Sequence, residues 1–194
     1  FHYNESKRIA EEKVFYFSKE SGLNFTIIKP GNVYGTRDHT FIEKYLEAME
    51  QGKIAFVDKG SHKTCPVYVN NLVDAIYIAS FNKEALGDTF FVTDGLDITW
   101  KQFTDKLADE MGLNRPTASV PYGVAYSVAA LMEFVYNLFN IQTPPLLTRY
   151  RIMNGGTDYT FSIEKAKKIL GWSPKVGLDQ AVKDTVKWYK SRGK

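Results

Sequence analysis

The chain has 194 residues, of which 44% are hydrophobic and 24% charged, and its formal net charge is +3. This length and apolar content are enough for a sizeable core and exclude a largely disordered chain. The lysines are scattered and form no basic stripe of the kind that nucleic-acid binding requires, so we expect no nucleic-acid partner.

Cysteine and histidine are too sparse for a disulfide framework or a metal centre. The single cysteine, Cys65, cannot form an intrachain disulfide, and its spacing from His2, His39 and His62 matches no metal-ligand pattern. We therefore expect no metal site and interpret Cys65 as a small core residue. The first residues show no signal-peptide pattern, and we expect a cytoplasmic protein.

The first predicted elements are a helix and a strand. Residues 5–22 have helical periodicity and end at a glycine, and a β-branched strand follows at 25–29. The sequence PGNVYG at 30–35 then breaks the strand, and its composition suits an ordinary turn. The side chains expected on the inner face of the helix are Ile9, Ala10, Val14 and Phe17.

Two capping-box spacings predict helix starts further along. Thr40 with Glu43 precedes a helix that stops near Gly52, and Thr99 with Gln102 precedes a second one. In a capping box the first side chain accepts a hydrogen bond from a free backbone N–H of the helix, and the later side chain returns one.

Strands and a third helix are predicted around these two helices. Short strands are expected at 54–57, 66–69 and 89–94, and a helix begins near Asn70 or Asn71. The residues expected to point inward from this helix are Leu72, Ala75 and Ile76.

The C-terminal third contains an apolar run at 120–141, a short strand at 158–162, and amphipathic helices at 162–171 and 178–191. The apolar run has about the length of a membrane span, but the charge of Glu133 would be costly in lipid. We expect a helix inside a substrate-binding domain. The alternatives are peripheral membrane contact, an apolar entrance to the substrate site, or a true membrane span.

Alternating strands and helices predict an α/β fold built around parallel strands. Such folds bind nucleotides through a glycine-rich turn after the first strand. No G-x-G-x-x-G pattern occurs in the chain.

Tyr3 and Lys7 are the first candidates for chemistry. Residues four apart lie on the same face of a helix. A nearby ammonium favours the phenolate and lowers the pKa of a tyrosine toward neutrality, so the pair can act as a general acid and base on an alcohol or ketone. The spacing alone is also compatible with a solvated helix face.

Four segments occur in the order that one family uses. YNESK, followed by Ala10 and Glu11, precedes FTIIKPGNVYG and then VYVNNLVDAI, and together they resemble the second half of an extended short-chain dehydrogenase/reductase. DYTFSIEKAKKILGWSP resembles the C-terminal segment of the branch that contains 3β-hydroxysteroid dehydrogenases and sterol-4-carboxylate 3-dehydrogenases. The resemblance runs from Tyr3 to about the end of the chain.

This resemblance implies an incomplete Rossmann-like fold, a doubly wound parallel sheet that lacks its N-terminal dinucleotide-binding half. That half, with the catalytic Ser or Thr, would precede Tyr3. We expect the chain to be a fragment that is inactive alone, with the missing N-terminal half of the same protein as a partner. Residues 1–82 would complete the Rossmann-like domain, and residues 83–194 would form mainly a smaller, mixed substrate-binding domain interleaved with it. The family often forms homodimers through the helix that carries the Tyr–Lys pair.

The resemblance also implies a nicotinamide cofactor, NAD or NADP, and a small-molecule substrate. Tyr3 would exchange a proton with the substrate oxygen, and Lys7 would hydrogen-bond the nicotinamide ribose. The other implied binding residues are Pro30, Gly31, Asn32 and Val33 for the cofactor, and Asn32, Tyr34 and Thr64 for the substrate.

The implied activity is the interconversion of a secondary alcohol and a ketone, on an apolar sterol-like or isoprenoid-like substrate. A nucleotide-sugar epimerase or dehydratase is the first alternative. Such enzymes commonly carry an arginine where this chain has Thr64, and the neighbouring Lys63 offers phosphate only a point charge. A non-catalytic NAD(P)-sensing or scaffold protein of the same fold is the second alternative.

Overall fold

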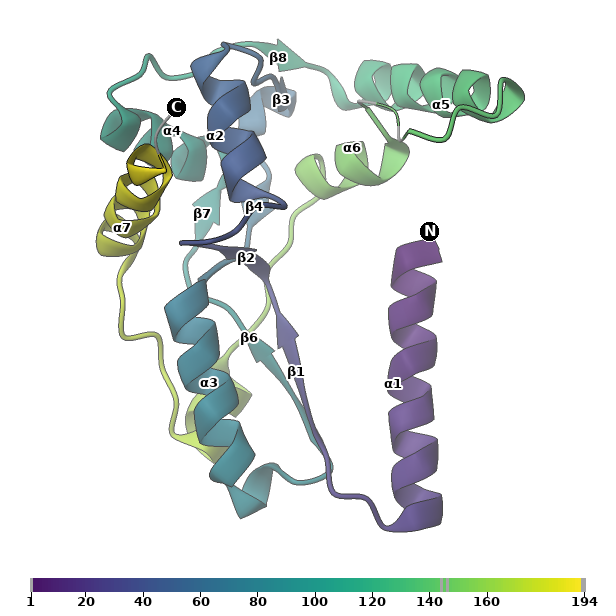
Figure 1. The fold of residues 1–194 in the computed structure, drawn as a ribbon, viewed down its shortest axis with the longest axis vertical. Coiled ribbons are helices and arrows are strands. Elements are labelled where there is room, and N and C mark those ends of the chain that lie inside the picture. Colours follow the sequence, from purple (N-terminus) through teal and green to yellow (C-terminus); the bar gives the residue numbers. More distant parts are fainter. Residues whose placement is uncertain (1, 144, 146, 193–194) are drawn as a thin grey trace. The chain divides into compact units, whose positions relative to one another are not determined.

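The computed structural model describes residues 2–143, 145 and 147–192 (Figure 1). The chain divides into two units and passes between them repeatedly. Unit 1 consists of Phe1–Val33, Pro66–Gly95 and Phe161–Gly177. Unit 2 consists of Tyr34–Cys65, Leu96–Thr160 and Leu178–Lys194. Helices alternate with strands, which confirms the predicted α/β class, while the predicted boundary between residues 82 and 83 stays a prediction.

Two parallel strands form the centre of unit 1. β1 (Thr26–Pro30) pairs with β6 (Asp88–Val92) in register along its whole length. Because side chains alternate along a strand, Ile28 and Phe90 point to one face, and Phe90 is fully buried. The strands therefore present one apolar face to a core.

The core on this face lies under α3 (Val69–Phe81) and a helical segment at Ala166–Leu170. Small residues on α3 allow close approach to the sheet, and Trp172 fills the largest share of the space. Ile76 was predicted to point inward but is 45% exposed. The packed stripe of α3 runs through Ala75 and Ala79, and Ile76 lies about 100° around the helix from Ala75.

A buried amide ties the C-terminal part of unit 1 to α3. The Asn71 side chain donates to Asp94 Oδ1 at 2.8 Å and to the carbonyl of Val176 at 2.9 Å. Its Oδ1 accepts from the backbone N–H groups of Lys175 and Val176 at 3.1 and 3.0 Å. The other oxygen of Asp94 accepts from the Tyr68 N–H at 2.9 Å. Every hydrogen-bonding position of the Asn71 amide is therefore used.

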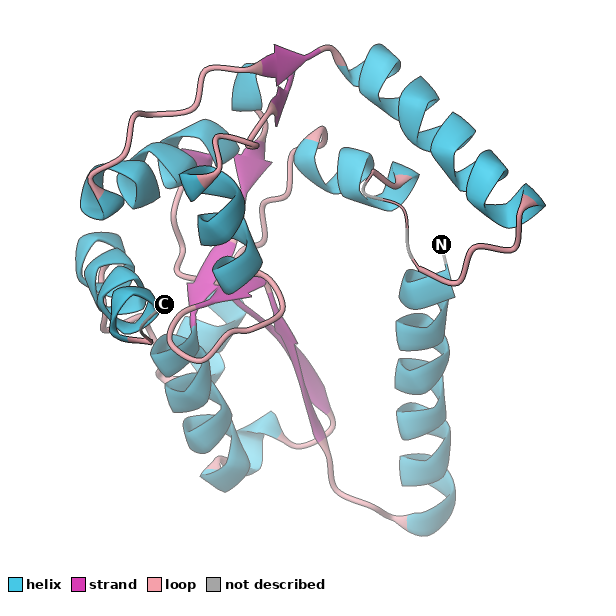
Figure 2. Cartoon of the chain, turned by 45° about the horizontal axis from the view of Figure 1, so that its top comes forward, coloured by secondary structure: helices cyan, strands magenta, loops and turns pink. Residues whose placement is uncertain are grey.

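α1 (His2–Ser21) runs beside β1 and β6 on the side away from α3 (Figures 1 and 2). It packs through a narrow stripe, because only Glu11, Val14 and Ser18 are partly buried. Ile9 and Phe17, which were predicted to face inward, are 39% and 56% exposed. The apolar residues of α1 lie on several sides of the helix, so hydrophobicity alone indicated the wrong face.

The described part of unit 2 contains two short strand pairs, five α-helices and a short 3-10 helix at Asp58–Gly60. β3 (Phe56–Val57) pairs in parallel with β8 (Ser119–Val120), and β4 (Lys63–Thr64) pairs antiparallel with β7 (Ile98–Thr99). The helices are α2 (Ile42–Glu50), α4 (Trp100–Met111), α5 (Tyr122–Leu138), α6 (Arg149–Gly155) and α7 (Leu178–Ser191). The predicted helix at 178–191 is confirmed as α7.

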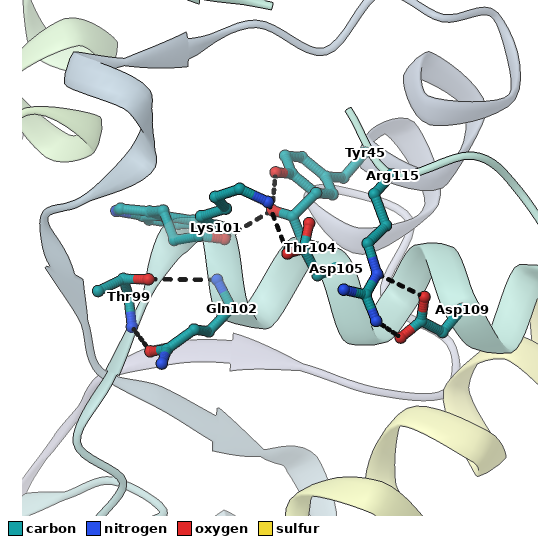
Figure 3. Close-up of polar contacts among 9 residues, drawn as sticks. Tyr45, Thr99, Lys101, Gln102, Thr104, Asp105, Asp109 and Arg115 are labelled. Carbon is teal, nitrogen blue, oxygen red and sulfur yellow. Dashed lines mark hydrogen bonds and ion pairs between the residues drawn. The ribbon is translucent and has the colours of Figure 1, made fainter. Parts of the chain in front are cut away.

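The two predicted capping boxes have different outcomes. Thr99 and Gln102 exchange both hydrogen bonds at the start of α4, as Figure 3 shows. At α2 the predicted box does not form, because the Asp38 carboxylate instead accepts from the N–H groups of Thr40, Phe41 and Ile42. An ionised carboxylate is a stronger acceptor than a hydroxyl, so Asp38 displaces Thr40 as the cap.

Two other expectations differ from the structure. Residues 158–162 were predicted as a strand but belong to none of the described strands, although the Tyr159 N–H donates to the carbonyl of Lys63. The PGNVYG segment was expected to be a loop, yet it contains the short strand β2 (Asn32–Tyr34). β2 pairs with β5 (Pro66–Tyr68), which explains its extended backbone.

α5 accounts for most of the predicted apolar run. Ala125 and Ala129 are its buried residues, while the larger apolar side chains on the other side are exposed, among them Leu131 at 63% and Phe134 at 62%. Glu133 forms an ion pair with Arg149 of α6 at 2.6 Å. Within the described ranges, no helix combines the length and apolar character that crossing a membrane requires. Membrane contact and homodimer formation stay predictions.

Candidate active site

Tyr3 and Lys7 lie together on the first two turns of α1. The Lys7 Nζ is 5.6 Å from the centroid of the Tyr3 ring, as expected for side chains four residues apart on a helix. Tyr3 is 59% exposed.

The pair lies on the same side of α1 as the partly buried residues of the helix, one of which, Glu11, contacts Lys29 of β1. Positions 3, 7, 11, 14 and 18 are three or four apart and form one stripe along the helix. Glu11, Val14 and Ser18 of this stripe are the partly buried residues of α1. Tyr3 and Lys7 therefore continue the partly buried side of the helix toward its N-terminal end.

The direction of α1 brings the pair to the end of β1 where ligands bind in parallel sheets. α1 runs antiparallel to β1, so the start of the helix and the end of the strand lie at the same end of unit 1 (Figure 1). In open α/β folds, ligands bind beyond the carboxyl ends of the parallel strands.

The segment after β1 belongs to this end of unit 1. Pro30 is the last residue of β1 and is exposed, and the Gly31 N–H donates to the carbonyl of Val92 at 2.9 Å. Asn32 and Val33 begin β2 and are partly buried. Unit 1 therefore contains six of the predicted site residues: Tyr3, Lys7, Pro30, Gly31, Asn32 and Val33.

The other two predicted site residues belong to unit 2 and are buried there. Tyr34 is fully buried and packs edge to face against Phe103, with ring centroids 5.1 Å apart. Thr64, in β4, is 2% exposed. Their predicted contact with substrate stays a prediction.

Lys63 beside Thr64 has a partner within unit 2. Its Nζ lies 2.6 Å from the Asp97 carboxylate, and the hydrogen bond and charge of Asp97 raise the pKa of Lys63. A phosphate at this lysine would compete with Asp97, so Lys63 makes a poor substitute for the arginine of nucleotide-sugar enzymes.

An ion pair that sequence reasoning missed lies next to the candidate pair. Glu11, one turn beyond Lys7 on the same stripe, contacts Lys29 of β1, with 2.6 Å between Oε1 and Nζ. The sequence signal was the repeat of Tyr3, Lys7 and Glu11 at intervals of four. Helical periodicity alone does not indicate which strand residue such a side chain meets, because Lys29 is a tertiary partner.

A metal-dependent site finds no support in the part of the chain that the structure describes. No group of three or more histidine, cysteine or acidic side chains there is arranged to hold a metal ion. Cys65 is buried, as predicted for a core residue.

Comparison with known proteins places this geometry in context. Residues 1–92 match the NAD dependent epimerase/dehydratase family. The predicted family resemblance is confirmed. The NAD dependence of that family also agrees with the predicted nicotinamide cofactor.

Curated relatives match almost the whole chain. It is 31% identical to short-chain dehydrogenase/reductase family 42E member 1 of Mus musculus, over 99% of this chain and 52% of that protein. It is 28% identical to sterol-4-alpha-carboxylate 3-dehydrogenase, decarboxylating, of the same organism, over 95% of this chain and 53% of that protein. The chain spans about half the length of the curated relatives it matches.

Solved structures confirm the Rossmann-type α/β fold. The crystal structure of gox2253 has a TM-score of 0.76 and 25% identity, over 98% of this chain and 56% of that one. UDP-glucose 4-epimerase from Thermotoga maritima, solved with UDP-glucose, has a TM-score of 0.71 and 22% identity, over 98% of this chain and 53% of that one. RMD from Pseudomonas aeruginosa, complexed with NADPH, has a TM-score of 0.67 and 15% identity, over 98% of this chain and 56% of that one. At these identities the last two show the fold alone.

Proposed function

We propose that these residues are the catalytic and substrate-binding part of a longer NAD(P)-dependent oxidoreductase that interconverts a secondary alcohol and a ketone. Within it, Tyr3 gives a proton to the substrate oxygen in the reductive direction and takes it back in the oxidative direction. Lys7 keeps a positive charge beside this phenol and hydrogen-bonds the cofactor ribose. We propose that the 194-residue chain alone does not turn over substrate.

One observation carries the proposal. The Tyr3 phenol and the Lys7 ammonium lie together on the sheet-facing stripe of α1, at the end of unit 1 where β1 finishes. A solvated helix face would not need to share the stripe through which the helix packs. The position of the pair therefore supports acid–base chemistry at the ligand end of a parallel sheet.

The residues of unit 1 fit the nicotinamide half of a dinucleotide. Lys7 offers an ammonium that can donate to ribose hydroxyls, and the exposed Pro30 offers a rigid apolar surface for a planar ring. The cofactor, when bound, supplies hydride transfer, and the protein positions it and handles the proton. No glycine-rich phosphate turn occurs in the 194 residues, so we propose that the other half of the longer protein holds the diphosphate.

The structure favours an apolar substrate over a nucleotide sugar. Lys63 is held by Asp97, and the neighbouring Thr64 cannot bind phosphate in a bidentate manner. In the same unit, α5 exposes a stripe of large apolar side chains, and its charged residue Glu133 is neutralised by Arg149. We therefore propose a sterol-like or isoprenoid-like alcohol as the substrate class.

Substitution of Tyr3 by phenylalanine tests the proposed chemistry. In the longer protein, Tyr3→Phe should lower kcat by at least about 100-fold, because it removes the acid–base hydroxyl. The melting temperature should not change, because the side chain is exposed. Tyr16→Phe is the matched control, since Tyr16 lies on the same helix with 60% exposure and should leave kcat unchanged.

Retained turnover in the Tyr3→Phe variant would refute the role of Tyr3. Binding of NADH without turnover of any alcohol, ketone or nucleotide sugar would instead favour a sensing or scaffold protein. Nucleotide sugars are tested by thermal protection, because specific binding stabilises the folded state. Protection by UDP-glucose and none by a sterol would reverse the proposed substrate class.

A further inference from the structure

The Glu11–Lys29 ion pair joins the helix of the candidate catalytic pair to the sheet. Glu11 lies at the middle of α1, and Lys29 is the last residue but one of β1. The side chains are 27% and 36% exposed, so the pair is partly shielded from water. Partial burial strengthens the attraction between the charges and makes their separation costly.

Lys29 is itself held in place by the neighbouring strand. Phe91 is the register partner of Lys29 on β6, and the Lys29 Nζ lies 5.8 Å from the centroid of the Phe91 ring. Phe91 in turn stacks on Phe161, with centroids 4.6 Å apart and an interplanar angle of 4°. The ammonium therefore has a fixed position over the sheet, where cation–π attraction adds to its pairing with Glu11.

Hydrophobic packing defines the rotation of α1 about its own axis only weakly. Ile9 and Tyr16 lie on one side of the helix and Phe17 on another, and all three are exposed, while Phe15 packs edge to face on Phe25 with ring centroids 5.0 Å apart. Phe15 stays 45% exposed, and the hydrophobic effect is non-directional, so this contact constrains the rotation less sharply than a directional one. An ion pair with an anchored partner is directional and selects one rotation, as buried polar contacts do in helix pairs.

Rotation of α1 determines where Tyr3 and Lys7 point. Side-chain atoms at a helix surface lie about 5–6 Å from the axis, so a rotation of about 20° moves them by roughly 2 Å. A displacement of about 1 Å in a catalytic group can lower a rate about 100-fold. Glu11 shares the stripe of Tyr3 and Lys7, so fixing Glu11 fixes the direction of both.

We propose that Glu11 and Lys29 are positioning residues, whose ion pair sets the rotation of α1 and thereby directs Tyr3 and Lys7 toward the reacting groups. This inference rests on the proposed oxidoreductase function. Neither residue contacts substrate or takes part in proton transfer.

The kinetic test uses the longer protein. Glu11→Gln and Lys29→Met should each lower kcat about 10- to 100-fold, with KM for substrate changed less than about 3-fold and the melting temperature lowered by less than about 3 °C. The double variant should be no slower than either single variant, because both remove one interaction. Lys29→Arg keeps the ion pair and the contact with Phe91, so it should retain kcat within about 3-fold.

Glu12→Gln is the matched control. Glu12 is the next residue of α1, and its substitution by glutamine removes the same charge. Its side chain pairs with Arg8 of the same helix and not with the sheet. Its kcat should equal that of the unchanged protein. Equal losses in Glu11→Gln and Glu12→Gln would show a general effect of charge and overturn the positioning role.

A second measurement needs no activity. In the 194-residue chain, spin labels at Lys13→Cys and Lys168→Cys, both exposed positions of unit 1, report the placement of α1. Cys65 is buried and should remain unlabelled. The distance distribution should broaden with Glu11→Gln and stay narrow with Lys29→Arg. An unchanged distribution in Glu11→Gln would overturn the inference, whereas an active Tyr3→Phe variant would overturn the proposed function and leave this result standing.

Discussion

Asn71 shows how one buried side chain can hold an irregular backbone segment, here the one at Lys175 and Val176. It is 1% exposed, and its amide joins Asp94 to the backbone at Lys175 and Val176. A buried polar group left without a partner costs about 1–3 kcal/mol, so removing a side chain with four hydrogen bonds affects several groups at once.

Asn71→Ala is therefore expected to lower the free energy of unfolding by about 2–4 kcal/mol. Urea denaturation of the 194-residue chain measures the change. Asn70→Ala is the control, because Asn70 is exposed at the preceding position and should change stability by less than about 0.5 kcal/mol. Similar losses in the two variants would mean that helix propensity, and not the buried network, determines the effect.

At the scale of single elements, the start of α2 depends on Asp38. Burial raises the pKa of its carboxyl, but hydrogen bonds from Ile42, Phe41 and Thr40 outweigh this effect and lower the pKa below its ordinary value. A group with a lowered pKa in the folded state stabilises the fold above its unfolded pKa, which is about 3.9 for aspartate. This stabilisation is lost as the pH falls through the lower folded pKa.

Asp38→Ala should lower the free energy of unfolding by about 1 kcal/mol at pH 7, because a helix cap is lost. The difference from the unchanged protein should shrink below about pH 4, as the native carboxylate becomes protonated. Denaturation at pH 7 and at pH 3 measures both values. Thr40→Ala distinguishes the two possible caps, and a larger loss for Thr40→Ala at pH 7 would restore the capping box read from the sequence.

The two capping boxes also show which parts of an element can be predicted from the sequence. Thr99 and Gln102 formed the expected box because no stronger acceptor precedes them, whereas Asp38 outcompetes Thr40. The position and length of α1, α4 and α7 followed from periodicity. The inward face of α1 did not, because an ion pair between Glu11 and a strand residue 18 positions later is a tertiary contact with no local signal.

At the scale of the whole molecule, periodicity predicted the α/β fold class, and the order of four motifs predicted the family resemblance. The candidate pair Tyr3 and Lys7 followed from a spacing, and the structure shows the two side chains together. The segments of unit 1 are far apart in the sequence, so local patterns do not indicate which of them pack together. Contacts such as that of Trp172 beneath α3 are long-range and leave no periodic pattern.

Unit 1 is incomplete without its last segment. Ile163, Leu170 and Trp172 are each at most 5% exposed and complete the core under α3. A chain of residues 1–160 should therefore lose the cooperative thermal unfolding of unit 1, although it contains every predicted site residue. A chain of residues 1–177 contains all segments of unit 1 and should keep a cooperative unfolding transition of that unit. Circular dichroism during heating measures both, and equal cooperative transitions would contradict this view of the core.

The late position of residues 161–177 has a consequence for synthesis on the ribosome. At about 5–20 residues per second, roughly 4 to 16 s separate the emergence of residue 95 from that of residue 177. During that interval the apolar faces of β1, β6 and α3 have no cover from the segment that carries Trp172. Nascent chains at this stage expose apolar surface that is prone to aggregation. We expect them to bind chaperones that act before the chain is released from the ribosome.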